Sequence, residues 1–428
     1  MRFGWSLLVV VLGLFQPGSS SAQNVLAGSV VSDRGLGLIG CQVVPLRRTF
    51  DHGIEVWREL LDFAAETDAR GAFRLSLLRD GDYIVEVRPP AALRLGSSVP
   101  RGTSPEFFVN LFAPSATSAK DAEVFAVRGG QVRAGIDVRL VKQKALSIRG
   151  SVWAPDGTPL AGERVYLGLA GLTPERSARS DSEGRFRVDQ LAPGEYGIFV
   201  FSDRGVHSSQ VSIASDLPDL QLQTESERRF RGILLADSAI PLDAARIGRF
   251  ELIELPRLMQ SSLAAEVKPD GRFEFPGALP IEYRLQLKGA AISAVYLDGE
   301  DRTDRPLHCL KAECILRIEI ADRPAELTLE LKDATIATGS PTAVLFPDDR
   351  QRWTPASFSV RAQLFQLDRT TVFRTISPGK YRLAVVSDVE PDEWFSPRFL
   401  AGLMNDSIEI NLSEGQLARV VLQARSVQ

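Results

Sequence analysis

The chain has 428 residues, of which 44% are hydrophobic and 24% are charged, and its formal net charge is -4 at pH 7. This is the composition of a folded protein that is too long for one hydrophobic core, and it predicts roughly two to four domains of about 100 residues each. The near balance of charges excludes a polybasic footprint for nucleic acid or for acidic membranes.

The first segment, residues 1–22, is predicted to be a signal peptide. Arg2 precedes an apolar run from Leu7 to Phe15, and small residues follow the run. This order is typical of a leader that is cleaved, here before Gln23. A membrane anchor is the alternative, but the run is shorter than the roughly 20 residues that a spanning helix needs. We expect an exported protein, secreted, periplasmic or at the cell surface, without stable membrane insertion.

A pattern that occurs four times dominates the rest of the chain. In its full form a copy has an Asp, a turn, a Phe that opens a strand, a second turn and a Tyr that opens the next strand. The first three copies are marked by Phe73 and Tyr83, Phe186 and Tyr196, and Phe273 and Tyr283, ten residues apart in each case. The fourth keeps Tyr381 but has Thr371 in place of the Phe, and it has Arg369 in place of the turn Gly.

The repeated residues have physical roles that predict strands. A Gly two residues before the Phe permits the positive φ of a tight hairpin turn. Residues 73–77 and their counterparts then alternate between apolar and polar, as in a half-buried strand. The Tyr ring can pack while its hydroxyl finds a backbone partner at the rim of the domain.

About seven short strands can be counted per copy, which is typical of a β-sandwich. We therefore predict an all-β protein of tandem seven-stranded antiparallel sandwiches, with no substantial helix after the signal peptide. The four predicted sandwiches cover residues 23–144, 145–226, 227–323 and 324–428.

The first predicted sandwich contains a long insertion loop, residues 91–126. It holds the aromatic cluster Phe107, Phe108 and Phe112. Such a loop is either a binding element or a lid that packs on its own domain. Packing is favoured, but a specific binding site in this protein would be sought here first.

Three cysteines remain for an oxidising compartment. Cys309 and Cys314 bracket four residues, so a tight turn can bring them together as a disulfide. Cys41 lies in an apolar strand pattern and is interpreted as a buried small residue.

No catalytic, metal or cofactor site is predicted. His52 and Glu55 have the His-x-x-Glu spacing of zinc peptidases, with His207 as a conceivable third ligand, but the two histidines belong to different sandwiches. His308 beside Cys309 and Cys314 offers only three mixed ligands, and a disulfide with a bystander His is favoured. No nucleophile elbow, phosphate loop or dinucleotide fingerprint occurs.

Carboxylates in the turns of the last sandwich allow two interpretations. They are either solvated turn residues, which is favoured, or ligands of a calcium ion, which binds hard oxygen ligands on loops. The residues concerned are Asp348, Asp349, Asp388, Glu390, Asp392 and Glu393.

The plan Gly-x-Val, Gly-x-Pro-Leu, Asp-x-x-Gly-x-Phe and Leu-x-Pro-Gly-x-Tyr, complete between Leu146 and Thr224, resembles the carboxypeptidase regulatory-like domain family. The resemblance implies a transthyretin-like sandwich, related to immunoglobulin-like folds, repeated as in multi-domain bacterial proteins of the acidobacterial type. It says less about function, because this module is mostly an accessory to other domains.

Two functions remain open. The favoured one is a non-enzymatic scaffold or adhesion-type protein that presents loops to a protein or cell-surface partner, and assembly roles are a smaller possibility. The alternative is an array of carbohydrate-binding modules, in which Trp153, Trp353 and Trp394 would stack on a glycan. No nucleic-acid partner is expected.

Overall fold

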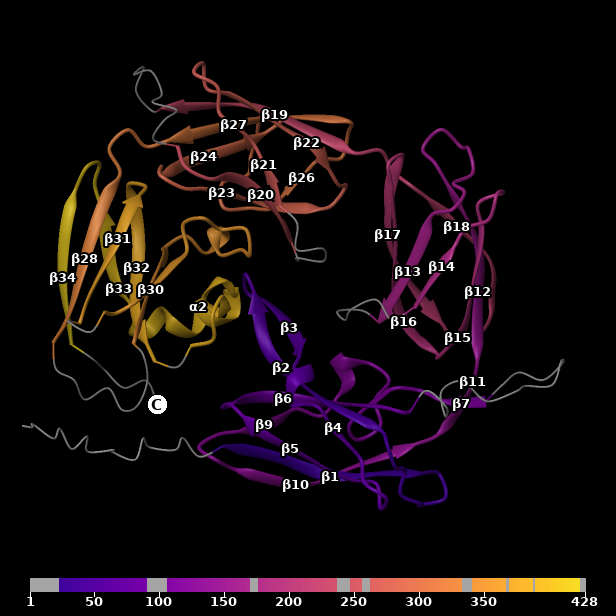
Figure 1. Cartoon of the computed structure of the whole chain (residues 1–428). Coiled ribbons are helices and arrows are strands. Elements are labelled where there is room, and N and C mark those ends of the chain that lie inside the picture. The colour runs from indigo at the N-terminus through magenta and orange to yellow at the C-terminus, as the bar shows by residue number, and fades with distance from the viewer. Residues whose placement is uncertain are drawn as a thin grey trace, which may run out of the picture. The chain divides into compact units, whose positions relative to one another are not determined.

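The computed structural model describes residues 23–90, 106–169, 176–236, 247–255, 262–332, 341–366, 369–387 and 389–423. The predicted signal peptide, residues 1–22, lies outside these ranges. The regular structure of the described residues is almost entirely β-strand (Figure 1). The chain divides into two compact units. Residues 1–47 and 59–144 belong to the first unit, and residues 48–58 and 145–428 belong to the second.

The first sandwich has one sheet with the order β10-β1-β5 and a second with the order β3-β2-β6-β8, in which β4 also pairs with β2 and β9 with β6. Residues 48–58, which hold the end of β2 and most of β3, are counted with the second unit. The 3-10 helices of the first sandwich are η1 (Leu61–Phe63) and η2 (Ala119–Asp121). Its strands are β1 (Asn24–Ser32), β2 (Gln42–Asp51), β3 (Ile54–Glu59), β4 (Ala65–Glu66), β5 (Ala72–Leu78), β6 (Gly81–Arg88), β7 (Glu106–Phe108), β8 (Leu111–Phe112), β9 (Phe125–Val127), β10 (Val132–Leu140) and β11 (Lys142–Lys144).

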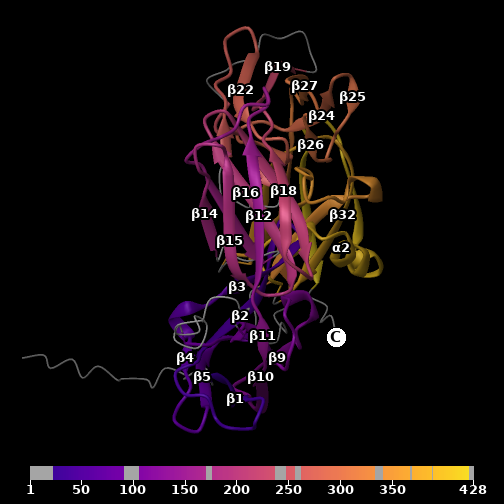
Figure 2. The same ribbon diagram turned by 90° about the vertical axis from the view of Figure 1, so that its right-hand side faces the viewer.

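The second sandwich belongs to the second unit and faces the viewer in Figure 2. Its sheets have the orders β15-β12-β18 and β14-β13-β16-β17. The strands are β12 (Leu146–Trp153), β13 (Arg164–Leu169), β14 (Arg176–Arg179), β15 (Arg185–Leu191), β16 (Gly194–Ser202), β17 (Gly205–Ile213) and β18 (Leu217–Gln223).

The third sandwich has sheets of the order β22-β19-β27-β24-β25 and β21-β20-β23-β26. The strands are β19 (Arg228–Ala236), β20 (Phe250–Leu255), β21 (Ser262–Ala264), β22 (Arg272–Ala278), β23 (Glu282–Leu287), β24 (Ile292–Leu297), β25 (Glu300–Asp301), β26 (Leu307–His308) and β27 (Glu313–Ile320).

The fourth sandwich has sheets of the order β31-β28-β34 and β30-β29-β32-β33. It also contains η4 (Arg350–Arg352), η5 (Glu393–Phe395), η6 (Met404–Asp406) and the short helix α2 (Pro397–Leu403). The strands are β28 (Ala325–Lys332), β29 (Thr342–Pro347), β30 (Arg361–Leu364), β31 (Thr370–Ile376), β32 (Gly379–Val386), β33 (Ile408–Leu412) and β34 (Leu417–Gln423).

One topology recurs in all four sandwiches and confirms the predicted all-β class. In each, the opening strand pairs antiparallel with the strand that holds the repeated Phe position, as β12 does with β15. On its other side the opening strand pairs parallel with a late strand, as β12 does with β18. The expectation of purely antiparallel sheets is therefore wrong for this one pair, because the late strand returns to the opening strand in the same direction.

The repeated Tyr occupies the place that its chemistry predicts. Tyr83, Tyr196, Tyr283 and Tyr381 are each at most 4% exposed. Three of the hydroxyls donate to the backbone carbonyl four residues upstream, at 2.9 to 3.1 Å. The hydroxyl of Tyr283 instead accepts from the backbone N–H four residues upstream, at 2.7 Å. The ring fills the core while the oxygen satisfies a backbone group in the preceding turn.

The repeated Phe lies opposite a glycine of the opening strand. Phe186 is paired with Gly150, and a Cβ added to Gly150 would lie 2.9 Å from atoms of the Phe186 ring. The same pairing joins Phe73 to Gly28 and Phe273 to Gly232. The aromatic ring therefore uses space that only a glycine leaves free.

The fourth sandwich exchanges the large and small partners of this pair. Thr371 stands in the position of the Phe and is paired with Leu329, which stands in the position of the glycine. Both are buried, at 3% and 0% exposure. The fourth copy, which departs most from the repeated pattern, thus keeps a filled core because the larger side chain has moved to the opposite strand.

The turn before the Phe also persists without its glycine. Gly71, Gly184 and Gly271 adopt φ values of 79°, 75° and 81°, and Arg369 adopts 59° at the equivalent position of the fourth copy. The N–H of Arg369 donates to the carbonyl of Gln366, three residues upstream. The backbone of this turn is therefore retained at the cost of placing a side chain in the left-handed region.

Part of the predicted insertion is regular structure. Residues 106–126 contain β7, β8, η2 and the start of β9, so this part is not the extended loop that the sequence predicts. β8 and β9 both pair with β6, and β7 pairs with β11. Residues 91–105 lie outside the described ranges.

Candidate functional site

A polar joint fastens the third sandwich to the fourth inside the second unit. Asp304 follows β25, has no exposed surface and adopts a φ of 59°. Its Oδ1 accepts hydrogen bonds from Ser357 Oγ at 2.9 Å and from the backbone N–H groups of Phe358 and Ser359 at 2.9 and 3.0 Å. Its Oδ2 lies 2.6 Å from Nε and 2.5 Å from Nη2 of Arg352. One loop of the fourth sandwich thus surrounds one carboxylate of the third.

That loop is shaped by its own local bonds. The Asp349 side chain accepts the backbone N–H of Gln351 at 2.9 Å and so caps η4. Trp353 is 5% exposed, and its Nε1 donates to the carbonyl of Pro347 at 2.7 Å. These contacts hold the backbone that presents its N–H groups to Asp304.

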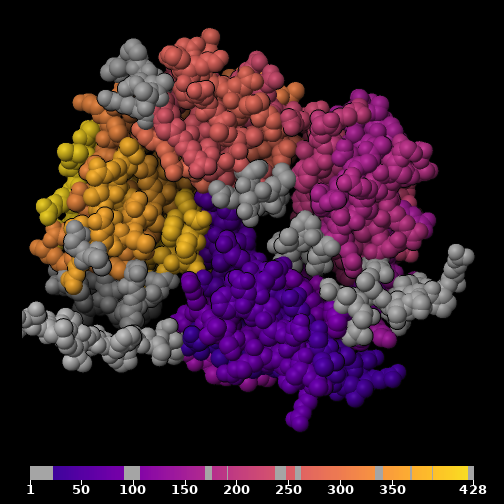
Figure 3. Space-filling view, in the orientation of Figure 1, coloured from indigo at the N-terminus to yellow at the C-terminus, as the bar shows by residue number. Residues whose placement is uncertain are grey.

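Apolar packing and a further hydrogen bond strengthen the joint. The Phe358 side chain packs against the hydrophobic core of the third sandwich. Ser377 Oγ donates to the carbonyl of Ile292 at 2.5 Å. The third and fourth sandwiches are therefore in contact through apolar as well as polar groups, and Figure 3 draws both in space-filling form.

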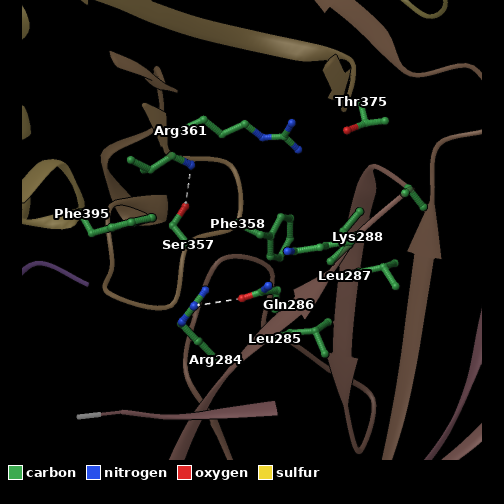
Figure 4. Close-up of a pocket in the computed structure, with 14 residues that line it drawn as sticks. Arg284, Leu285, Gln286, Leu287, Lys288, Ser357, Phe358, Arg361, Thr375 and Phe395 are labelled. Atoms are coloured by element: carbon green, nitrogen blue, oxygen red, sulfur yellow. Dashed lines mark hydrogen bonds between the residues drawn. The ribbon is translucent and has the colours of Figure 1, made fainter. Parts of the chain in front are cut away.

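A cavity of about 320 Å³ lies next to this joint (Figure 4). One wall comes from residues between 284 and 292 of the third sandwich. The other wall comes from residues between 357 and 361 of the fourth, with Thr375 and Phe395. The cavity exists because β23 and the loop after it meet the Ser357 to Arg361 segment without filling the space between them.

The charged residues that line this cavity are all cations. They are Arg284, Lys288 and Arg361, and the described lining contains no Asp or Glu. Arg361 Nη1 donates to the carbonyl of Arg374 at 2.6 Å, and Arg284 Nη2 donates to Gln286 Oε1 at 3.1 Å. Burial lowers the pKa of Arg361 from its usual value, because the charged guanidinium is removed from water.

The sequence did not single out Asp304, Arg352 or the three cations. Asp304 stands among ordinary turn residues, and the cations resemble the many solvated arginines of this chain. Only the pairing of two sandwiches brings them together.

The aromatic cluster of the predicted insertion is buried. Phe107, Phe108 and Phe112 are 4%, 5% and 0% exposed. These rings are buried within the first unit, and the role of the insertion stays a prediction.

The predicted cysteine pair is joined in the structure. Cys309 and Cys314 form a disulfide, with Cα atoms 5.8 Å apart. Cys41 carries a free thiol and is 0% exposed. Burial raises the pKa of Cys41, although a hydrogen bond to Thr67 opposes the shift. Cys41 therefore has the environment of an unreactive core residue.

His207, considered as a third zinc ligand, is engaged in two short contacts within its own sandwich. His207 lies on β17, and its Nδ1 and Nε2 are 2.7 Å from the carbonyl of Gln223 and 2.8 Å from Ser209 Oγ. His308 lies on β26 beside the disulfide. Glu55 Oε2 lies 3.9 Å from Arg48.

Within the described ranges, one group of His, Cys, Asp or Glu side chains brings three ligand atoms within 4.8 Å of one another: Asp51, His52 and Asp392. His52 Nδ1 lies 3.1 Å from Asp51 Oδ1 and 3.9 Å from Asp392 Oδ2. The sequence analysis considered His52 as a zinc ligand and Asp392 as a calcium ligand, and no local sequence pattern connects the two residues. Three ligands that include a nitrogen do not suit calcium, which takes six to eight oxygens.

The other turn carboxylates have structural partners. Asp348 Oδ1 lies 2.6 Å from Arg382 Nε, and Glu393 Oε2 accepts the backbone N–H of Glu390 at 3.3 Å. Asp388 lies outside the described residues. The interpretation of these carboxylates as solvated turn residues stays a prediction.

The three tryptophans differ in exposure. Trp353 is buried, and Trp394 packs against the same apolar cluster. Trp153 is partly exposed, and its Nε1 donates to Ser151 Oγ at 2.9 Å and to Gln221 Oε1 at 2.7 Å. Trp153 and Trp394 are both partly exposed, and Trp353 is buried.

Comparison with solved structures finds similar chains in bacterial proteins. The Bacillus anthracis TIE protein has a TM-score of 0.19 and 10% identity, with 90% of this chain and 68% of that chain covered. A streptococcal ancillary pilin has a TM-score of 0.25 and 12% identity over 71% of this chain and 99% of that chain. A minor pilin of Streptococcus agalactiae has a TM-score of 0.23 and 12% identity over 47% and 96%. TM-scores this low carry no argument about function or assembly.

No curated protein matches the chain. Among the described residues, no helix has the length and apolar character needed to cross a bilayer. Residues 147–223, which form the second sandwich, match the family model of the carboxypeptidase regulatory-like domain.

Proposed function

We propose that this chain is a non-enzymatic scaffold or adhesion-type protein that acts outside the cytoplasm. In this role the tandem sandwiches hold loops in place for a protein or cell-surface partner. The observation that carries the proposal is the joint at Asp304. Its buried carboxylate accepts three hydrogen bonds from the next sandwich and forms an ion pair with Arg352 of that sandwich. A buried carboxylate whose oxygens are all bonded restricts the relative motion of the two domains that it joins, which suits a spacer that presents loops.

Three side chains of types that often serve in active sites have structural partners here, which supports the same role. His207 and Asp349 bond to neighbouring groups of their own sandwich, and Cys309 is in a disulfide. These residues serve the folding of their domains.

Fractionation of the native organism, followed by cross-linking, tests this proposal. We expect the chain in the envelope or the medium, with its leader removed, and cross-linked to one partner in repeated preparations. A bacterial sandwich protein of similar charge, expressed in the same way, serves as the control. A chain that stays in the cytoplasm with residues 1–22 attached, or that cross-links no differently from the control, contradicts the proposal.

An array of carbohydrate-binding modules is the alternative. Its support comes from the two partly exposed rings, Trp153 and Trp394, because Trp353 is buried. A glycan array decides this alternative: binding that Trp153→Ala abolishes would favour it, and an array without signals would end it.

A further inference from the structure

Three side chains that can bind a metal ion meet inside the second unit. Asp51 ends β2, His52 follows in the turn before β3, and Asp392 directly precedes η5. Residues 48–58 and 145–428 form this unit together, so the group lies within one compact unit. One ligand atom of each residue lies within 4.8 Å of the other two. The nitrogen of His52 that faces both carboxylates is Nδ1.

The turn that carries His52 packs closely against the segment that follows Asp392. A Cβ added to Gly53 would lie 2.4 Å from the backbone C of Phe395 and 2.4 Å from the backbone N of Ser396. His52 is 8% exposed, and the centroid of its ring lies 5.0 Å from that of Phe395. These contacts hold the imidazole in one place, which is what a metal ligand requires.

Two of the three residues have an unfavourable backbone conformation. His52 adopts a φ of 49° and Asp392 a φ of 67°, in the left-handed region where a side chain is costly. Such residues are concentrated at sites where function needs a side chain in a particular direction. In this structure both conformations accompany side chains that face one another.

The types of ligand favour a divalent transition-metal ion such as zinc. Zinc binds imidazole nitrogen and carboxylate oxygen, whereas calcium and magnesium prefer shells made of oxygen. Ligands at about 2.0 Å from a tetrahedral ion lie about 3.3 Å apart. Nδ1 of His52 lies 3.1 Å from Asp51 Oδ1 and 3.9 Å from Asp392 Oδ2. The side chain of Asp392 is 35% exposed, so a small rotation can bring its oxygen to the ion.

Asp51 can bind an ion and keep other contacts. A carboxylate has two oxygens with about four lone-pair positions, so one oxygen can ligate while the other bonds elsewhere. A divalent ion also balances the charges of the two carboxylates that meet here. Glu55 and His207, the partners that the sequence offers to His52, are not part of this group.

We propose that Asp51, His52 and Asp392 bind one divalent transition-metal ion, with water at the remaining position. The site goes beyond the scaffold role and does not depend on it. Its ligands come from the turn after β2 and from the residue before η5, so the ion acts as a clasp between these two parts of the second unit. Binding therefore stabilises the folded chain according to the affinity for the ion.

Calorimetric titration of the full chain, after treatment with EDTA and dialysis, tests the proposal. The probes are zinc chloride and calcium chloride at constant ionic strength. We expect one zinc ion to bind per chain, and calcium to bind at least about tenfold more weakly. Cobalt chloride is a third probe, because the visible absorption of a bound cobalt ion reports its nitrogen and oxygen ligands.

Substitutions locate the site. His52→Asn removes the imidazole and Asp392→Asn removes a charged ligand, and Asn tolerates the left-handed backbone at both positions. Each should weaken zinc binding about tenfold or more, since even the outer partners of a metal site contribute this much. Asp392 is the more exposed residue, so its variant is expected to fold even if His52→Asn does not. His207→Asn and Asp406→Asn are the matched controls, because they remove the same side chains from positions outside the group.

Three results would overturn the proposal. They are the absence of saturable zinc binding, equal affinity for zinc and calcium, or an equal loss of zinc affinity in Asp392→Asn and Asp406→Asn. The first would mean that a protonated His52 holds the two carboxylates together without an ion. The third would mean that the general negative charge of the chain, and not this group, attracts zinc.

Discussion

Arg352 and Asp304 are 48 residues apart in the sequence, and the Nη2 and Oδ2 atoms of their side chains lie 2.5 Å apart. The carboxylate has no exposed surface, whereas 28% of the arginine side chain is exposed. The ion pair joins the third sandwich to the fourth, and the hydrogen bonds from Ser357, Phe358 and Ser359 satisfy the other carboxylate oxygen. This relationship leads to the first prediction.

Asp304→Asn should lower the free energy of unfolding of the fourth sandwich by about 2 kcal/mol. The amide keeps an oxygen that can accept hydrogen bonds, and Asn tolerates the left-handed backbone, but Arg352 loses its counter-charge. Urea denaturation followed by tryptophan fluorescence measures the change, since Trp353 and Trp394 report on this sandwich. Asp406→Asn removes the same charge from an exposed position and should change stability by less than about 0.5 kcal/mol. Equal effects of the two variants would contradict a special role for Asp304.

Thr371→Phe should destabilise the fourth sandwich by about 2 kcal/mol, because Leu329 fills the space that a glycine leaves in the other copies. Leu329→Gly should also destabilise, because it opens a cavity. The double variant restores the glycine and aromatic pair of the other sandwiches, so its loss should be smaller than the sum of the two single losses. A double-mutant cycle from urea denaturation measures this coupling. If the losses of unfolding free energy are additive, the side chains at the two positions do not compensate for one another in size.

Arg369→Gly should stabilise the fourth sandwich by about 0.5 to 1 kcal/mol. The native residue pays a steric cost at a φ of 59°, which glycine does not pay. Arg374→Gly is the comparison, because it places a glycine inside β31 and should destabilise. If both glycine variants lower the denaturation midpoint, the turn at Arg369 is not strained.

Asp68, the turn aspartate of the first copy, should make the stability of its sandwich depend on pH in the acidic range. Backbone hydrogen bonds from Ala72 and then Arg70 hold the pKa of Asp68 below its usual value of 3.8. A carboxyl with a lowered folded-state pKa contributes stability that is complete above about pH 4 and disappears as the pH falls through the folded value.

Asp68→Asn should therefore flatten the stability profile of the first unit below about pH 4, since the amide oxygen accepts the same bonds without titrating. Hydrogen exchange of the Ala72 amide between pH 3 and pH 6 measures this effect, after correction for the intrinsic rate. Asp33→Asn, at an exposed turn residue, is the control. A profile unchanged by Asp68→Asn would contradict the role of this carboxylate.

The three cysteines should differ in their reactivity. Peptide mapping without reductant should recover Cys309 and Cys314 as one linked fragment. Cys41 should resist iodoacetamide in the folded chain and react after unfolding, because it is buried and its pKa is raised. Leu417→Cys places a thiol at a position that is 82% exposed. Its rapid reaction with iodoacetamide is the reference rate for an accessible cysteine. Free thiols at Cys309 and Cys314, or rapid labelling of native Cys41, would contradict these assignments.

The sequence by itself determined the class of the protein and its repeated unit. The alternation around Phe73 and Phe186 and the turns before Tyr83 and Tyr196 are local signals, because a strand or a turn is specified by residues close to one another in the chain. The buried positions of the four tyrosines follow from their amphipathic chemistry in the same way.

Only the tertiary structure decided how the copies compensate and how they meet. The exchange of volume between Leu329 and Thr371 depends on the register of two strands, and the parallel pair of each sandwich depends on the return of a late strand. Asp304, Arg352 and the cavity cations come from two sandwiches and have no shared motif. The physical reason is that burial and charge balance are set by neighbours in space, which a local pattern does not contain.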